Sequence, residues 1–283
     1  MNAVLGMLVS RSNVSTGLVD VNSKTLYQNT LCQSAIDYSG ISDEILNTLL
    51  AHIKQAFEHT PVHQQKIAIA VPGPFDYENG ISLFKSPRKH GAIYGIDIKT
   101  WLVRHLKVDP ANIHFVNDTA AFLQGEILHG NVGSHNCALG VKLDRTPGIS
   151  IFENDLSCCE PLESLVFKDR TAQECLSTQW LSRKYYELTG INMEFESYRS
   201  SYSGTIKDVI KEYIENLCII LSHFVNEYDP QIIVIDGDIT KAVPKFLFQI
   251  RSALLKDQIK TPVFLSTLKN IAAITGCASL FPN

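Results

Sequence analysis

The sequence predicts a two-domain α/β protein, and three observations lead to this prediction. The chain has 283 residues, of which 45% are hydrophobic and 19% charged, so it is long enough for two domains with cores of their own. Its apolar segments follow the order meander, helix, strand and helix, and a similar set then follows, which is typical of two similar halves. Several short apolar runs stop at turn residues, as buried strands do.

The first half contains the clearer pattern. Residues 4–9, 17–21 and 25–30 are apolar segments separated by turn residues and predict a three-stranded meander. Ser42 precedes an amphipathic helix with an apolar face made of Ile45, Leu46, Leu49, Leu50, Ile53 and Phe57. Residues 66–71 predict a buried strand, Asp97 caps a short helix, and 113–116 predict a strand that leads into a helix over 119–129.

The second half repeats these signals less regularly. Residues 137–143 and 148–152 predict a hairpin joined by the turn 144–147. A helix is expected near 172–189, and a long one over 205–228, where apolar side chains lie on one side. Residues 231–235 predict a buried strand, and a last helix around 268–280 is expected to pack back on the first half.

Composition excludes some classes of function. A formal charge of −4 and a pI near 6.1 leave no basic excess to neutralise a phosphate backbone, which disfavours nucleic-acid binding. The start has no export signal, and no run of about 18 apolar residues occurs, so we expect a cytoplasmic protein. The 7 cysteines are odd in number and lack a spacing framework, which indicates reduced thiols.

Three segments in order resemble one family. They read AVPGPFD at 70–76, followed by Gly80, then VNDTAA at 116–121 with Gly125 and Glu126, then IVIDGDI at 233–239. This set resembles the ROK family of bacterial sugar kinases and sugar-responsive regulators. The resemblance implies the two-domain actin-like ATPase (ribonuclease H-like) fold with a cleft between the domains. It places an N-terminal α/β domain at 1–116, with 268–283 packing back on it, and a C-terminal α/β domain at 117–267.

The same resemblance implies a sugar site. In the family the Asp of the Asn-Asp pair is the general base for a sugar hydroxyl, which is Asp118 here. Asn117 would bind a neighbouring hydroxyl, and Gly73 and Pro74 would line the cleft wall. Glu174 is the nearest match to the family's sugar-binding Glu. The alternatives remain open: Asp118 could simply cap the helix that follows, and Glu174 could be solvated surface, with Glu163 as a second candidate.

The phosphate loops depart from the family pattern. The position of the first glycine-rich loop carries Ser10, Arg11 and Ser12, and that of the second runs from Asp144 to Gly148 through Thr146. Side chains there should crowd the backbone approach that glycine leaves open, and the Asp144 carboxylate adds repulsion of roughly 1 kcal/mol where phosphates would lie. In the family a further turn contacts the adenosine side of the nucleotide, and Gly237 retains the glycine of that turn. Arg11 and Arg145, one in each loop, could instead bind an anion through their guanidinium groups.

The cofactor and partner expectations follow. The resemblance implies ATP with Mg, while the altered loops predict weakened binding. Zinc is not expected, because the family's cysteine-rich element is not reproduced by Cys158, Cys159 and Cys175. A small-molecule sugar is the expected partner, and a homodimer is compatible with the family. The prediction is therefore a sugar kinase homologue, acting on a hexose or N-acetylhexosamine, with weak or lost activity; the alternative is a non-catalytic sugar sensor or partner-binding protein.

Overall fold

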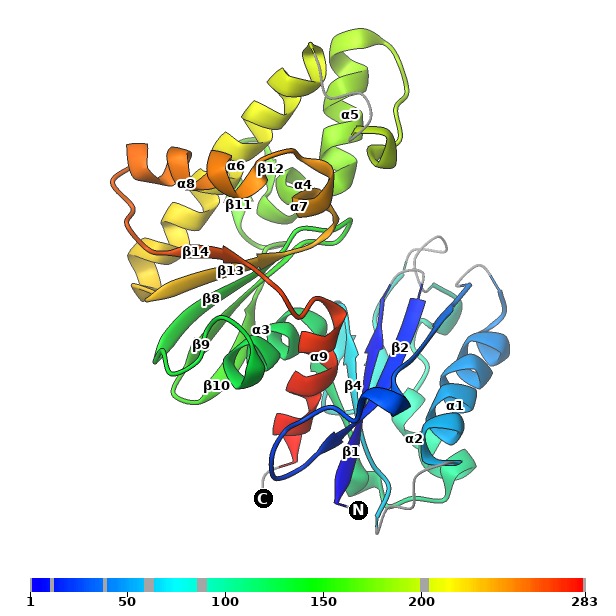
Figure 1. Cartoon of the computed structure of the whole chain (residues 1–283). Helices are drawn as coiled ribbons and strands as arrows, with labels where there is room; N and C mark the ends of the chain where they lie inside the picture. The colour runs from blue at the N-terminus through cyan, green and yellow to red at the C-terminus, as the bar shows by residue number, and fades with distance from the viewer. Residues whose placement is uncertain are drawn as a thin grey trace. The chain divides into compact units, whose positions relative to one another are not determined.

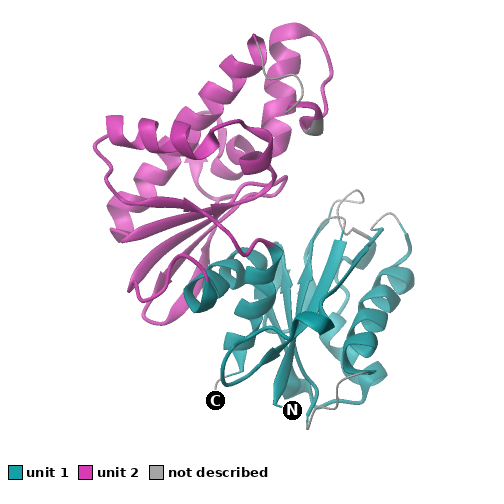
Figure 2. Ribbon diagram, in the orientation of Figure 1, with its two compact units in different colours: residues 1–129, 270–283 teal, residues 130–269 magenta. Residues whose placement is uncertain are grey.

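The computed structural model describes residues 2–10, 13–37, 40–58, 64–85, 91–198 and 204–281. The chain divides into two compact units, residues 1–129 with 270–283, and residues 130–269 (Figure 2). The sequence-based division after residue 116 differs from this. Helix α3 (Asp118–His129) stays in the first unit because it packs along α9 (Asn270–Gly276), which also belongs there.

The sheet of the first unit has five strands in the order β3-β2-β1-β4-β7. The first three strands form an antiparallel meander, whereas β1, β4 and β7 run parallel. A separate two-stranded hairpin is made of β5 (Phe75–Asp76) and β6 (Ile81–Ser82). The main strands are β1 (Ala3–Val9), β2 (Asn13–Asp20), β3 (Cys32–Ala35), β4 (Lys66–Val71) and β7 (Ile113–Asn117).

Helices cover both faces of this sheet (Figure 1). On one face α1 (Ser42–Glu58) and α2 (Ile98–Leu106) share an apolar core with alternate residues of β1 and β4. The predicted cap of α2 is confirmed, since the Thr100 backbone N–H donates to the Asp97 carboxylate at 2.8 Å. On the other face α3 and α9 lie side by side, with the short helix η5 (Cys277–Leu280) after them. The C-terminal segment 270–283 belongs to the first unit.

Two glycines let α3 and α9 approach closely. A side chain on Gly125 of α3 would collide with the Ala272 backbone carbonyl, and one on Gly276 would collide with the Ala121 carbonyl. Because the backbones touch there, no larger residue fits at either position without moving a helix. This contact fixes α3 against the rest of the unit.

The second unit has a sheet with the same topology, in the order β10-β9-β8-β13-β14. Again three strands are antiparallel and three are parallel, with β8 shared between the two sets. The prediction of two similar halves is therefore confirmed at the level of the sheets. The strands are β8 (Cys137–Lys142), β9 (Gly148–Glu153), β10 (Leu156–Glu160), β13 (Ile232–Asp236) and β14 (Val263–Leu265).

The helices of the second unit pack into one large apolar core with the sheet. The long helix α6 (Thr205–Tyr228) runs beside α5 (Thr178–Thr189), and a small hairpin of β11 (Val166–Phe167) and β12 (Arg170–Thr171) precedes α4 (Ala172–Leu176) (Figure 1). The remaining helices are α7 (Asp238–Ala242) and α8 (Phe246–Lys256). Within the described segments, none of the helices combines the length and the apolar character needed to cross a bilayer.

Two secondary-structure predictions were wrong in detail. The third strand of the meander is β3, not 25–30; Leu26 forms only an isolated bridge with Val19, and a 3-10 turn follows at Gln28–Thr30. The helix expected over 172–189 is two helices, because Ser177 has an extended backbone and caps the second one. Its hydroxyl oxygen accepts from the Trp180 N–H at 3.2 Å.

Candidate functional site

The predicted site residues of the first unit meet at one edge of its sheet. Strands β4 and β7 are parallel, and Val71 lies opposite Asn117 in their register. Because both strands end there, the turn with Gly73 and the start of α3 lie at the same carboxyl edge, where open α/β sheets usually bind ligands. Gly73, Asn117 and Asp118 are half-buried, and Pro74 is exposed.

Asn117 caps helix α3. Its side-chain oxygen accepts hydrogen bonds from the Thr119 backbone N–H at 2.8 Å and from the Ala120 N–H at 3.3 Å. These are two of the N–H groups that a helix start leaves without partners. Asp118 follows as the first residue of α3. The capping role that the sequence allowed for Asp118 is therefore performed by Asn117.

Asn117 is also held from the other side. Its amide nitrogen donates to the Tyr77 hydroxyl at 2.9 Å, and that hydroxyl donates to the Val71 carbonyl at 3.3 Å. A Cβ on Gly73 would lie in ordinary van der Waals contact with the Tyr77 hydroxyl, at 3.4 Å, so the turn packs directly against this phenol. The two strand ends are thus linked through one amide and one phenol. Sequence reasoning missed Tyr77, whose aromatic character close to the Pro-Gly-Pro turn was the available signal.

The position of Asp118 follows from these contacts. A carboxylate in the first turn of a helix interacts favourably with the positive end of the helix dipole. The cap at Asn117 and the close α3–α9 contact fix where this first turn lies. The chain therefore presents a half-buried carboxylate at the sheet edge, next to a half-buried hydrogen-bond network.

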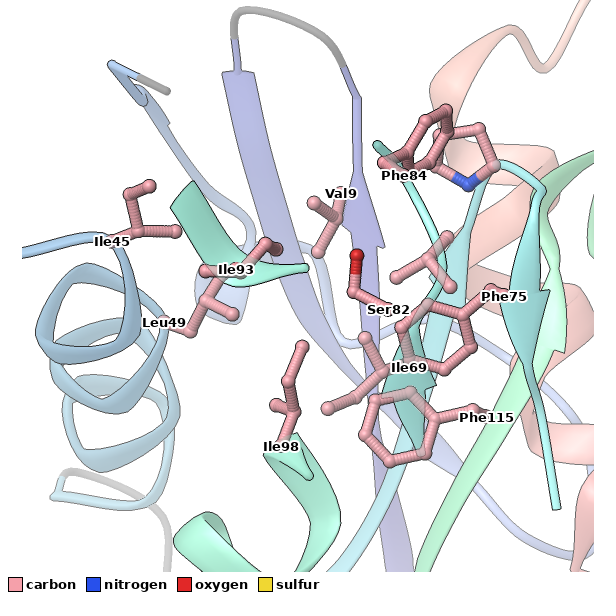
Figure 3. Close-up of a pocket in the computed structure, with 12 residues that line it drawn as sticks. Val9, Ile45, Leu49, Ile69, Phe75, Ser82, Phe84, Ile93, Ile98 and Phe115 are labelled. Atoms are coloured by element: carbon pink, nitrogen blue, oxygen red, sulfur yellow. The ribbon is translucent and has the colours of Figure 1, made fainter. Parts of the chain in front are cut away.

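A small apolar cavity of about 20 Å³ lies under the Pro-Gly-Pro turn (Figure 3). Val71, Pro72 and Phe75 line it, and Ser82 is the one polar side chain of its lining. The Ser82 hydroxyl is buried and has no hydrogen-bond partner among the described residues. A sugar ring needs many hydrogen bonds when it is buried, so this cavity does not suit one; its volume suits about one water molecule.

Glu174 belongs to the second unit and has a local structural role. Its carboxylate accepts from the Thr171 N–H, and the Thr171 hydroxyl accepts from the Glu174 N–H, both at 3.2 Å. This reciprocal pair is a capping box at the start of α4. The side chains of Glu174 and Glu163 are exposed. The local structure thus accounts for Glu174 without a ligand.

The loop from Leu143 to Gly148 meets Gly237 at the carboxyl edge of the second sheet. Gly237 has φ 122°, and a Cβ there would lie 2.5 Å from the Leu143 carbonyl oxygen. The predicted residues Thr146 and Gly148, both half-buried, lie on the same loop. The fold thus brings into contact two segments that the sequence analysis assigned to nucleotide binding, and glycine is required at Gly237.

Asp144 occupies a backbone donor at this junction. The Asp238 N–H, the first of α7, donates to the Asp144 carboxylate at 2.8 Å, and the Lys142 ammonium lies 4.0 Å from it. Burial raises the pKa of the Asp144 carboxyl, while Lys142 and the Asp238 N–H act in the opposite direction. A carboxylate of the chain itself thus takes a donor that an anionic ligand would need.

Of the two arginines considered as anion ligands, the structure describes only Arg145. Arg145 donates from Nη2 and Nε to the Gln179 side-chain oxygen at 2.7 and 3.1 Å, with the amide oriented to satisfy both groups. These two hydrogen bonds connect the loop to the start of α5. Arg11 and Ser12 lie outside the described residues. Ser10 closes the turn after β1, because its hydroxyl donates to the Asn13 carbonyl at 2.9 Å.

The two sheets identify the fold. Two units with the same five-stranded topology, each with three antiparallel and three parallel strands, are typical of the two-domain actin-like ATPase fold. More particularly, the fold is that of ROK sugar kinases. The ROK hexokinase from Thermus thermophilus superposes with a TM-score of 0.83 at 14% identity, covering 98% of this chain and 97% of that one.

Two other solved structures agree. A ROK-family glucokinase from Streptomyces griseus, in complex with glucose and AMPPNP, has a TM-score of 0.76 at 16% identity and covers 98% of both chains. A ROK-family transcriptional regulator, homologous to the E. coli MLC protein, has a TM-score of 0.75 at 17% identity; 98% of this chain aligns with 77% of that one. No protein-family model and no curated protein matches the sequence. At these identities the likeness shows the fold alone.

Proposed function

We propose that this chain is a ROK sugar kinase homologue that binds a hexose or N-acetylhexosamine at the β7–α3 junction. The observation that carries the proposal is the double anchoring of Asn117, to the start of α3 and to Tyr77, beside Asp118. This network fixes a carboxylate and one further amide N–H at the carboxyl edge of a parallel sheet. The glucose bound by the Streptomyces griseus glucokinase supports a sugar as the ligand class.

Asp118 is the proposed general base. A carboxylate within hydrogen-bond reach of a sugar hydroxyl can accept its proton as the oxygen attacks phosphorus. Asn117 is a positioning residue, because it orders the first turn of α3 that carries Asp118. Gly73 and Pro74 would form the adjoining wall. Glu174 remains a proposed sugar ligand, although its capping box already explains its position.

The residues on the nucleotide side do not fit a triphosphate well. ATP with Mg would require backbone donors free of side chains at the loop around Thr146 and Gly148 and at the turn of Gly237. Instead, the Asp144 carboxylate holds the Asp238 N–H, and Arg145 is turned to Gln179. We therefore assign no phosphoryl-transfer step to this chain and propose that kinase activity is weak or lost.

The decisive experiments separate the sugar side from the nucleotide side. Calorimetric titration with ATP and Mg should give weak or no binding, whereas a panel of hexoses and N-acetylhexosamines should contain a sugar that raises the melting temperature. A coupled assay, with Asp118→Asn as the inactive control, measures any phosphorylation. Robust turnover that Asp118→Asn abolishes would show that the altered loops still bind ATP, and no response to any sugar would refute the sugar site.

A non-catalytic sugar sensor is the second candidate, favoured by the Asp144 contact. A sensor would be stabilised by its sugar with no response to ATP. Retained turnover would exclude it. We further propose a cytoplasmic protein with a small-molecule sugar as partner and a homodimer as its assembly, which size measurements in solution test directly.

A further inference from the structure

A polar cavity of about 150 Å³ lies within the second unit, and its lining residues differ from those of the loop of Thr146 and the turn of Gly237. It is bounded by the β11–β12 hairpin, by α4 and α5, and by one face of α6. This volume is more than the roughly 10–15 Å³ that one water molecule requires, so a small ligand group fits. The lining comprises Lys168, Asp169, Arg170, Cys175, Trp180, Arg183, Lys184, Glu187, Glu212 and Asn216.

The charges of this lining are unevenly neutralised. The Lys184 ammonium pairs with the Glu212 carboxylate at 3.0 Å, so these two charges cancel locally. Arg183 and Glu187 form a looser pair at 3.8 Å, one turn apart on α5. Four cationic and three acidic side chains line the cavity, which leaves one excess positive charge before exposure is considered.

The charges of the lining differ in exposure: Lys168 and Asp169 are exposed, whereas Arg170 is half-buried. Asp169, the remaining carboxylate, has a side chain 83% exposed and lies 3.9 Å from Arg170, close to the limit for an ion pair. Water screens such a pair strongly, so it contributes little. The Arg170 side chain is only 33% exposed, so water screens its charge less than it screens the charge of Asp169. Lys168 has no carboxylate partner among the residues that the structure describes.

The Lys168 ammonium is held by a neutral group instead. It donates to the Asn216 side-chain oxygen at 2.7 Å and lies 5.4 Å from the centre of the Phe167 ring. Asn216 is 1% exposed, and its amide nitrogen has no hydrogen-bond partner within the described parts of the chain. The Asn216 amide nitrogen thus keeps an unused donor, and Asn216 lies in the wall of a cavity that already carries excess positive charge.

We propose that this cavity binds the phosphoryl group of a small molecule. Lys168 and Arg170 supply charge and donors, and the Asn216 amide supplies a neutral N–H that an oxyanion oxygen satisfies. The ligand is either free phosphate or a phosphorylated sugar, which share this group. The site is independent of the sugar site at Asp118, so either proposal can fail without the other.

The test is thermal unfolding with inorganic phosphate, a hexose 6-phosphate or the neutral hexose, each compared with sodium chloride at equal ionic strength. Phosphate should raise the melting temperature of the wild type by about 2–4 °C, the shift that a ligand contributing about 1 kcal/mol gives in a chain of this size. Lys168→Met and Arg170→Gln should lose this shift. Lys211→Met is the matched control, since Lys211 lies on α6 with its side chain 78% exposed.

The outcomes are distinguishable. Stabilisation by both phosphate compounds supports a site for free phosphate, and stabilisation by the sugar phosphate alone supports a phosphorylated sugar, provided that Lys168→Met abolishes it. An equal effect of chloride and phosphate overturns the proposal, and so does a phosphate shift that persists in both Lys168→Met and Arg170→Gln. A shift with neutral hexose that neither variant changes belongs to the site at Asp118.

Discussion

The Asn117 amide nitrogen donates to the Tyr77 hydroxyl at 2.9 Å, and through it the ends of strands β4 and β7 are tied together. The same Asn117 side chain begins α3. One side chain thus contacts both the start of α3 and Tyr77, which follows the Pro-Gly-Pro turn, and Asp118 is the next residue in the chain.

Tyr77→Phe should weaken the proposed sugar site while the fold persists. The substitution removes the hydroxyl that Asn117 and Val71 share, at a cost of about 1 kcal/mol to the free energy of unfolding. We expect a smaller sugar-induced rise in melting temperature than for the wild type. Tyr27→Phe, which removes a hydrogen bond to Asp20 in the same unit, is the control and should leave the sugar response intact. An unchanged response in Tyr77→Phe would contradict the positioning role.

Asp144→Asn tests the obstruction of the nucleotide loop. The amide keeps an acceptor for the Asp238 N–H but removes the negative charge. If that charge repels phosphates by roughly 1 kcal/mol, ATP affinity should rise roughly five-fold in calorimetric titration. Asp155→Asn, at an exposed turn of the same sheet, should change nothing. Weaker ATP binding in Asp144→Asn would mean that the carboxylate assists the nucleotide rather than repelling it.

Gly237→Ala should destabilise the second unit by more than the usual cost of a left-handed residue. Its φ of 122° and the Leu143 carbonyl 2.5 Å from the new Cβ act together. Gly190→Ala provides the comparison, because Gly190 has φ 69° and nothing within 4 Å of its Cβ. We expect Gly190→Ala to lower the free energy of unfolding by about 1–2 kcal/mol and Gly237→Ala to lower it by more, both measured by urea unfolding. Equal losses would show that the loop yields to the side chain.

Acidification should destabilise the chain through His52. The ring is buried, 5% exposed, and lies 2.6 Å from the Ser34 hydroxyl, while its Nδ1 has no partner in the described structure. Burial lowers its pKa below the ordinary 6.5. The unfolded chain therefore takes up the proton first, so stability present above pH 6.5 is lost as the pH falls towards the folded pKa.

Urea unfolding at about pH 7.5 and about pH 5.5 measures this effect. The slope from one such group is at most about 1.4 kcal/mol per pH unit. Burial also lowers the pKa of His114, so the wild-type slope contains both contributions. His52→Gln should reduce, but not abolish, the dependence of the free energy of unfolding on pH. Parallel curves for the wild type and His52→Gln would refute the assignment.

Much of the fold could be predicted because its signals are local. The face of α1, the cap at Asp97 and the strand 66–71 each depend on spacing within one segment, and the structure has all three. The third strand of the meander could not be placed, since its pairing with β2 depends on register and not on its own apolar content. The break at Ser177 was also missed. The apolar pattern runs on through 172–189, but Ser177 is extended and caps a second helix.

The sequence by itself determined the repeated order of elements, the Asn117-Asp118 pair after a strand and the absence of glycine from residues 10–12 and 144–147. Only the tertiary structure decided that Asn117 caps α3, that Tyr77 holds it, and that Asp144 takes the Asp238 N–H. The reason is physical. Periodicity and caps are properties of neighbouring residues, whereas the last two contacts join residues 40 and 94 positions apart, which only the packed sheets bring within hydrogen-bond distance.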